Sequence, residues 1–146
     1  MKIIGFHINK ISAERKSPIK GKLEVKSNID IKDIVKEEVN ISNKPGLKFD
    51  FEFIINYEPK VAEVTITGSV LAIDDKDESK EILKEWKKKK FTHEVKLHLF
   101  NFILDKCNLK AMQLEDELSL PTHIPLPKIR PQQDQQGQGT PANYTG

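Results

Sequence analysis

The chain has 146 residues, of which 37% are hydrophobic and 32% are charged, which suits one domain with a modest core and argues against two independent domains. Its 24 basic and 22 acidic side chains leave a formal net charge of +2, so no global field draws the protein to nucleic acid or to an acidic membrane. The single cysteine, Cys107, excludes an internal disulfide and fits a reducing compartment. No run approaches the roughly 20 apolar residues of a membrane helix, and the N-terminal segment turns polar at His7, before the length of a signal peptide is reached. We therefore expect a soluble cytoplasmic protein that does not insert into membranes.

The first part of the chain predicts strands with one apolar face. Residues 4–8 and 21–27 both alternate between apolar and polar or small side chains. We expect these two segments to pair with each other, across a break marked by Ser17 and Pro18. Residues 29–41 fit a strand and a helical turn equally well, and we favour a strand that gives way to an irregular excursion.

Two clearer strands follow, at residues 47–57 and 61–73, each with one apolar and one polar face. Gly68 could mark a bulge or bend in the second of them. Four antiparallel strands with one apolar face need a cover, which the helices that follow can supply. The aromatic stripe Phe49, Phe51 and Phe53 is expected in the core. The carboxylates Asp50, Glu52 and Glu63 are expected on the solvated face, as a solubilising or docking surface.

Two helices are predicted after the strands. Acidic residues at 74–78 favour a helix N-terminus, and residues 79–90 form a short helix with Trp86 on its buried side. Thr92 is the predicted N-cap of a longer helix that runs from His93 to about Leu114. The apolar arc of the longer helix is wider than packing against one sheet requires, which implies a second contact with another subunit, a client or both. That arc comprises Val95, Leu99, Phe102, Ile103 and Cys107, with Leu97, Phe100, Leu104 and Met112 beside them.

The end of the chain lacks apolar periodicity. From Arg130 onward it is rich in glutamine, glycine and proline, so we expect a disordered polar tail at residues 130–146 after a single domain at residues 1–129.

No motif for catalysis or for a cofactor is evident. The histidines stand at positions 7, 93, 98 and 123, and no pair has the spacing of a metal site, so we expect no metal. Cys107 lies on the apolar stripe of its helix, where a thiol behaves as a small hydrophobe. The sequence has no glycine-rich phosphate loop and no nucleophile elbow. We therefore expect a protein that is not an enzyme and that needs no cofactor.

One run of basic residues stands out. It ends in Lys87, Lys88, Lys89 and Lys90, and it could meet a phosphate backbone with Trp86 as a stacking group. The same lysines also suit the solvated C-terminal end of a helix, whose dipole favours positive charge.

The order of elements after Lys60 is the feature that points to a family. A strand, an acidic turn, a charged helix and a longer apolar helix lead into a proline-punctuated exit at residues 118–127, with Leu120, Pro121 and Pro125. This order resembles the C-terminal half of the SecB-type export chaperones and their SecB-like relatives. The resemblance implies an α+β fold, in which a four-stranded antiparallel sheet is covered on one face by a long helix.

The resemblance also implies a homo-oligomer, a dimer or a tetramer, that holds unfolded or nascent polypeptide in apolar grooves. The polypeptide-binding residues would be Phe100, Leu104, Leu120, Ile124 and Leu126. Two departures are visible: no second helix follows the exit, so one groove wall is missing, and the acidic docking surface of such chaperones is only partly echoed, which argues against coupling to secretion. The alternative is a ribosome-associated or other ribonucleoprotein subunit of the same fold, which contacts RNA through residues 87–90 and the tail.

Overall fold

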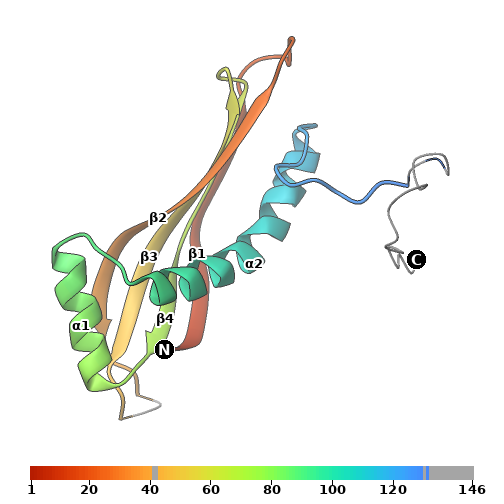
Figure 1. Ribbon diagram of the computed structural model, residues 1–146. Coiled ribbons are helices and arrows are strands. Elements are labelled where there is room, and N and C mark those ends of the chain that lie inside the picture. Colours follow the sequence, from red (N-terminus) through yellow and green to blue (C-terminus); the bar gives the residue numbers. More distant parts are fainter. Residues whose placement is uncertain (41–42, 130, 132–146) are drawn as a thin grey trace.

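The computed structural model describes residues 1–40, 43–129 and 131. Four strands form one antiparallel sheet, and two helices follow them in the chain (Figure 1). The architecture is the predicted α+β arrangement, with the long helix crossing one face of the sheet. The tail expected at residues 130–146 lies outside the described residues, apart from Pro131. The elements are β1 (Lys2–Arg15), β2 (Glu24–Glu37), β3 (Gly46–Glu58), β4 (Ala62–Ile73), α1 (Lys76–Lys87) and α2 (His93–Glu117).

The order of strands across the sheet is β1-β4-β3-β2, which corrects the pairing predicted for the first two strands. β1 pairs with β4, and β2 pairs with β3, so β1 and β2 are the two edges of the sheet. The connection at residues 16–23 crosses the end of the sheet, where the backbone N–H groups of Lys16 and Ser17 both donate to the carbonyl of Val61. Three strand spacings of about 4.8 Å separate the edges, and this connection is long enough to span them.

Both edge strands are longer than their alternation predicted, because bulges interrupt it. The register of β1 shifts between Ile3 and Gly5 and again between Ile8 and Lys10, and that of β2 shifts between Ile31 and Asp33. An extra residue moves the following side chains to the opposite face. β2 therefore continues as a strand to Glu37 through the segment whose pattern was ambiguous, and the irregular excursion starts only after it.

The core lies on one face of the sheet. In β3 every second side chain is buried, and in β4 most are, whereas the residues between them are half-exposed. Full burial of such aliphatic and aromatic side chains stabilises the fold by about 2 kcal/mol each. The buried residues of β3 are Leu47, Phe49, Phe51, Phe53, Ile55 and Tyr57, all no more than 1% exposed.

The helix α2 supplies the other half of the core through a stripe of side chains spaced four residues apart. Leu99, Ile103, Cys107 and Ala111 are each 0% exposed. Thr92 is the N-cap, as predicted, but the helix continues three residues beyond the predicted end. Its last turn contains no basic residue. Instead, the guanidinium of Arg15, at the end of β1, donates to the carbonyls of Leu118 and Ser119 at 3.0 and 3.1 Å.

The helix α1 is displaced by three residues from its prediction, to Lys76–Lys87. It begins early because Asp75 takes the N-cap position, and it ends early because Lys89 has a left-handed backbone with φ of 56°. Lys88, Lys89 and Lys90 thus form a turn rather than a helical face. Neither helix within the described residues is long and apolar enough to cross a membrane.

The opposite face of the sheet is polar, as predicted for its carboxylates. Asp50 accepts a hydrogen bond from the Ser69 hydroxyl at 2.7 Å. Lys32 pairs with Asp30 at 2.9 Å and with Glu52 at 3.5 Å. Charged side chains on this face therefore pair with each other while they remain in contact with solvent.

Candidate functional site

A surface groove runs beside the free edge of β2, and we call it the β2 groove. It has a volume of about 500 Å³, and five consecutive residues of β2, positions 28–32, form one side of it. In the described part of the chain β2 pairs only with β3, so its outer edge carries backbone donors and acceptors without a strand partner. The other side is built from α1, the turn after it and α2. The lining residues are Asn28, Ile29, Asp30, Ile31, Lys32, Trp86, Lys89, Phe91, Lys96 and Phe100.

Three half-buried aromatic rings make the β2 groove apolar on the helical side. Trp86 comes from the last turn of α1, Phe91 from the turn that follows, and Phe100 from α2. The rings of Trp86 and Phe91 lie 5.4 Å apart at 54°, in a tilted contact. The indole N–H of Trp86 also points to Asp33 of β2, at 3.4 Å from its carboxylate oxygen. The turn at residues 88–90 folds the chain back, and this places rings from both helices beside one strand edge.

Lysine side chains lie over two of these rings. The ammonium nitrogen of Lys89 is 4.5 Å from the centre of the Trp86 ring, and that of Lys96 is 5.5 Å from the centre of the Phe100 ring. These are cation–π contacts, which leave the positive charge in place. Within the described residues, neither lysine has an ion pair with a carboxylate. Lys32 differs, because its hydrogen bond to Asp30 raises the pKa of its ammonium group.

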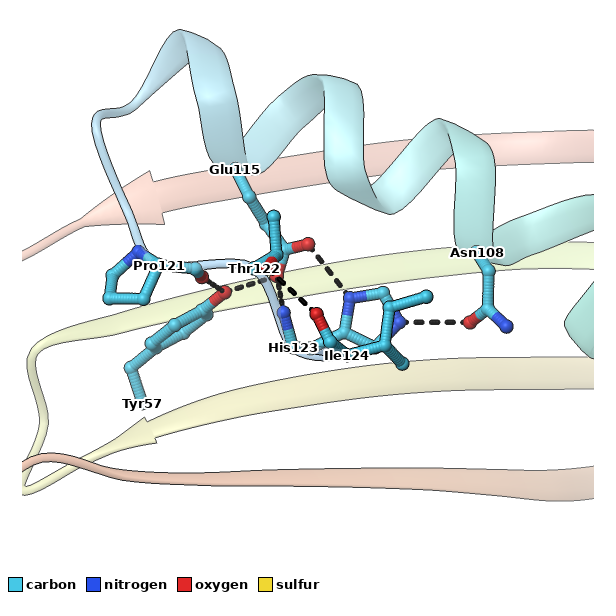
Figure 2. A network of polar contacts seen from close by, with 7 residues as sticks. All are labelled: Tyr57, Asn108, Glu115, Pro121, Thr122, His123 and Ile124. Carbon is cyan, nitrogen blue, oxygen red and sulfur yellow. Dashed lines mark hydrogen bonds and ion pairs between the residues drawn. The ribbon is translucent and has the colours of Figure 1, made fainter. Parts of the chain in front are cut away.

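A second feature is a buried network of polar contacts at the C-terminal end of α2, which we call the clasp (Figure 2). Its centre is Glu115, which is 0% exposed. One carboxylate oxygen accepts the backbone N–H of His123 at 3.0 Å, and the other lies 2.7 Å from the Nδ1 atom of the His123 ring. The phenol of Tyr57, from β3, contacts Glu115 and lies 2.5 Å from the carbonyl of Pro121. The Nε2 atom of His123 lies 2.8 Å from the side-chain oxygen of Asn108.

The clasp fixes the start of the exit segment to the sheet. The imidazole of His123 is 2% exposed and lies edge-on to Phe53, with ring centres 5.9 Å apart. Burial, together with the hydrogen bond and the charge of Glu115, raises the pKa of Tyr57, so the phenol stays protonated. Figure 2 shows the exit segment passing between α2 and the strands at this point. The segment from Leu120 to Ile124 is therefore held in place by polar contacts in addition to apolar packing.

The five residues predicted to bind polypeptide lie in different surroundings. Phe100 lines the β2 groove, and Leu104 is half-buried on α2. Leu120 is 6% exposed and belongs to the core. Ile124 and Leu126 line a separate cavity of about 580 Å³ formed by the exit segment itself, where Leu126 is 52% exposed. Lys87, Lys88, Lys89 and Lys90 are all exposed, and Lys89 reaches the β2 groove.

Sequence reasoning missed the clasp and part of the groove. Glu115 continues the stripe of Leu99, Ile103, Cys107 and Ala111 at the same four-residue spacing, and this was the signal that it is buried. Phe91 was not assigned to any site, and Trp86 was placed on the buried side of a helix that ran through residue 90, with a surface role only as a stacking group for nucleic acid. The turn at residues 88–90 is what brings them to the groove.

Two further groups bear on chemistry. Cys107 is fully buried, and burial raises the pKa of its thiol to about 11, so it is a neutral thiol at physiological pH. Among the described residues, the carboxylates of Asp74, Asp75 and Glu78 come within 4.8 Å of one another. Burial alone would raise the pKa of Asp74, but hydrogen bonds from Glu78 and from the Asp75 N–H outweigh burial and lower it. The hydrogen bond and the charge of Asp74 raise the pKa of Glu78.

No protein-family model matches this sequence. No curated protein matches it at a significant level either. Among solved structures, the chain is similar to a SecB-like chaperone of Mycobacterium tuberculosis in complex with a ChAD peptide from the HigA1 antitoxin. The two share 12% sequence identity with a TM-score of 0.49, over 89% of this chain and 91% of the other. A likeness at this level carries no argument about function, so membership of the SecB-like family stays a prediction.

Proposed function

We propose that this protein is a SecB-like holdase, which binds unfolded or nascent polypeptide and catalyses no reaction. The observation that carries the proposal is the β2 groove, where three aromatic rings lie beside an unpaired strand edge. A strand edge offers main-chain hydrogen bonds to any extended peptide, and neighbouring apolar pockets accept its alternate side chains. Such a site recognises an extended backbone and apolar side chains, and unfolded polypeptides of any sequence expose both.

The exit segment forms a second contact area in this proposal. Pro121, Pro125 and Pro127 cannot donate ladder hydrogen bonds, so the segment joins no strand and presents Ile124 and Leu126 at its own cavity. The clasp fixes the backbone of the segment at Pro121 and His123, which limits the movement of the two side chains that follow. Leu120 is buried in the core at the start of the segment.

A dimer or a larger homo-oligomer is part of the same proposal. Leu97 and Leu109 of α2 are 54% and 66% exposed, although they lie on the helix that covers the sheet. Large apolar side chains exposed along one helix favour an interface. An oligomer would bring the grooves of several subunits within reach of one client.

Suppression of aggregation tests the proposal directly. A reduced, unfolded model protein is allowed to aggregate with and without a several-fold excess of this protein, and we expect clear suppression by the wild type. The variant Phe91→Ser with Phe100→Ser should lower client affinity at least about tenfold, because each anchor in a binding site is worth about 1–2 kcal/mol. Leu126→Asp tests the exit segment separately. The matched control is Ile11→Ser, which removes an exposed apolar side chain of β1, on the opposite edge of the sheet.

Thermal melts of all variants separate binding from folding. The proposal fails if the wild type gives no suppression, or if the groove variants melt as the wild type does and suppress aggregation equally well. If the Phe91 and Phe100 variant unfolds, the single change Phe91→Ser, in the turn, replaces it.

A ribonucleoprotein subunit is the second candidate, favoured by the four exposed lysines at residues 87–90. Cosedimentation with ribosomes at low and high salt tests it. Binding that falls steeply with salt and is abolished by reversing these four charges would support RNA contact. Association that ignores both salt and charge would reject it.

A further inference from the structure

We infer that the β2 groove selects acidic segments of polypeptide, in which aspartate or glutamate flanks an aromatic or aliphatic residue. The inference rests on the proposed function and names the substrate class of the same site. Three lysines and one aspartate line the groove: Lys32, Lys89, Lys96 and Asp30.

The single acid of the groove is already occupied. Asp30 pairs with Lys32 at 2.9 Å, and Lys32 also reaches Glu52, so this cluster offers little net charge to a ligand. Lys89 and Lys96 remain, and within the described residues their ammonium groups contact aromatic rings in place of carboxylates. The groove thus presents two uncompensated positive charges, one from the turn after α1 and one from the first turn of α2.

The position of each cation sets the pattern of the ligand. An apolar side chain that enters beside Trp86 or Phe100 brings its sequence neighbours next to the ammonium group that covers that ring. A carboxylate there can pair with Lys89 or Lys96 while the cation stays on its ring, whereas a lysine there would be repelled. An extended segment with alternating apolar and acidic residues therefore satisfies both the rings and the cations.

The backbone at Lys89 supports this reading. Its φ of 56° lies in the left-handed region, where glycine or asparagine is the usual residue. A lysine here is held in a costly conformation, and that conformation carries its ammonium group over Trp86. The selectivity is local, because the chain as a whole is nearly neutral.

Three labelled peptides of about twelve residues test the inference. They share the same phenylalanines and leucines and differ only in the residues between them, which are glutamate, glutamine or lysine. Dissociation constants are measured by fluorescence anisotropy at low salt and at about 0.5 M salt. Since exposed ion pairs are individually weak, we expect the acidic peptide to bind about tenfold more tightly than the basic one, with the neutral peptide between them. High salt should remove most of this difference.

The matched variants locate the effect. Lys89→Gln with Lys96→Gln should abolish the difference in affinity between the acidic and the neutral peptide. The control is Lys2→Gln with Lys10→Gln, two exposed lysines on the opposite edge strand, which should preserve the order of affinities. Circular dichroism melts confirm that each variant is folded.

The outcomes separate this inference from the proposed function. If all three peptides bind equally, or the basic one binds most tightly, the inference is wrong and the holdase proposal stands. If none of the peptides binds, both are wrong. A single-stranded oligouridylate of the same length is added as a competitor of the labelled acidic peptide. If the oligouridylate displaces that peptide at a lower concentration than the unlabelled acidic peptide does, the inference is overturned in favour of RNA. Displacement only by acidic peptide supports it.

Discussion

Replacing Glu115 by alanine should destabilise the protein more than any change at an exposed carboxylate of the same helix. The substitution removes the acceptor for the backbone N–H and the ring Nδ1 of His123, and both groups are buried. Each unsatisfied buried donor costs about 1–3 kcal/mol, and the substitution leaves two of them without their acceptor. Tyr57 retains its contact with the Pro121 carbonyl, so its share of the loss is small. We expect a total loss of about 3–5 kcal/mol in the free energy of unfolding.

Urea denaturation followed by circular dichroism measures this loss. With a slope of about 1–3 kcal/mol per molar urea, the midpoint should fall by about 2 M. Glu115→Gln keeps the shape and one acceptor oxygen, so it should lose about 1–3 kcal/mol. Asp116→Ala, an exposed neighbour, is the matched control and should stay within about 0.5 kcal/mol of the wild type.

Hydrogen exchange distinguishes local from global loss. The amide of His123 donates to Glu115 in the wild type, so its exchange should be fast in Glu115→Ala even where the sheet remains protected. Equal midpoints for Glu115→Ala and Asp116→Ala, with unchanged protection at His123, would refute the reasoning that the clasp stabilises the exit segment.

Three further predictions follow from burial, packing and exposure. Cys107 should resist iodoacetamide at pH 8 in the folded protein and react on unfolding. The pKa of its thiol is near 9 in the unfolded chain and about 11 in the folded protein, so the free energy of unfolding should fall as the pH rises from 9 to 11. The variant Cys107→Ala should not show this fall. Gly68→Ala should cost about 1–3 kcal/mol in a urea melt, because its Cβ would lie 2.3 Å from the His7 carbonyl, whereas Gly5→Ala meets only an ordinary contact and should be nearly neutral. Light scattering at tens of micromolar should give a mass well above 16.7 kDa, reduced by Leu109→Asp; a monomeric wild type would contradict the predicted oligomer.

The sequence predicted the central strands and the long helix because each buries one face only. In β3 the period of two is unbroken from Leu47 to Tyr57, and in α2 the apolar stripe is continuous, so local pattern and burial agree. The edge strands were predicted too short, because the bulges at Ile4, Asn9 and Lys32 break the alternation of apolar and polar residues. The order of the strands could not be predicted from their spacing in the sequence.

The candidate site was predictable only in part. Phe100 was expected at a binding surface and does line the β2 groove, but the groove also depends on the turn at residues 88–90, where a lysine adopts a backbone that its side chain does not favour. The clasp depends on Tyr57, Glu115 and His123, which meet only through tertiary structure. Glu115 is the first of three consecutive acidic residues and therefore looks solvated in the sequence, and its spacing from Ala111 is the one indication otherwise.

The contact of Arg15 with the end of α2 bears on how the domain folds. A helix whose last turn lacks positive charge leaves its C-terminal carbonyls uncompensated, so an isolated α2 would fray at that end. Here the compensating cation comes from a strand 103 residues earlier in the chain. The final turn of α2 can therefore become stable only after the whole sheet has placed β1 beside β4. The contact thus couples the first strand of the domain to the C-terminal end of its last helix.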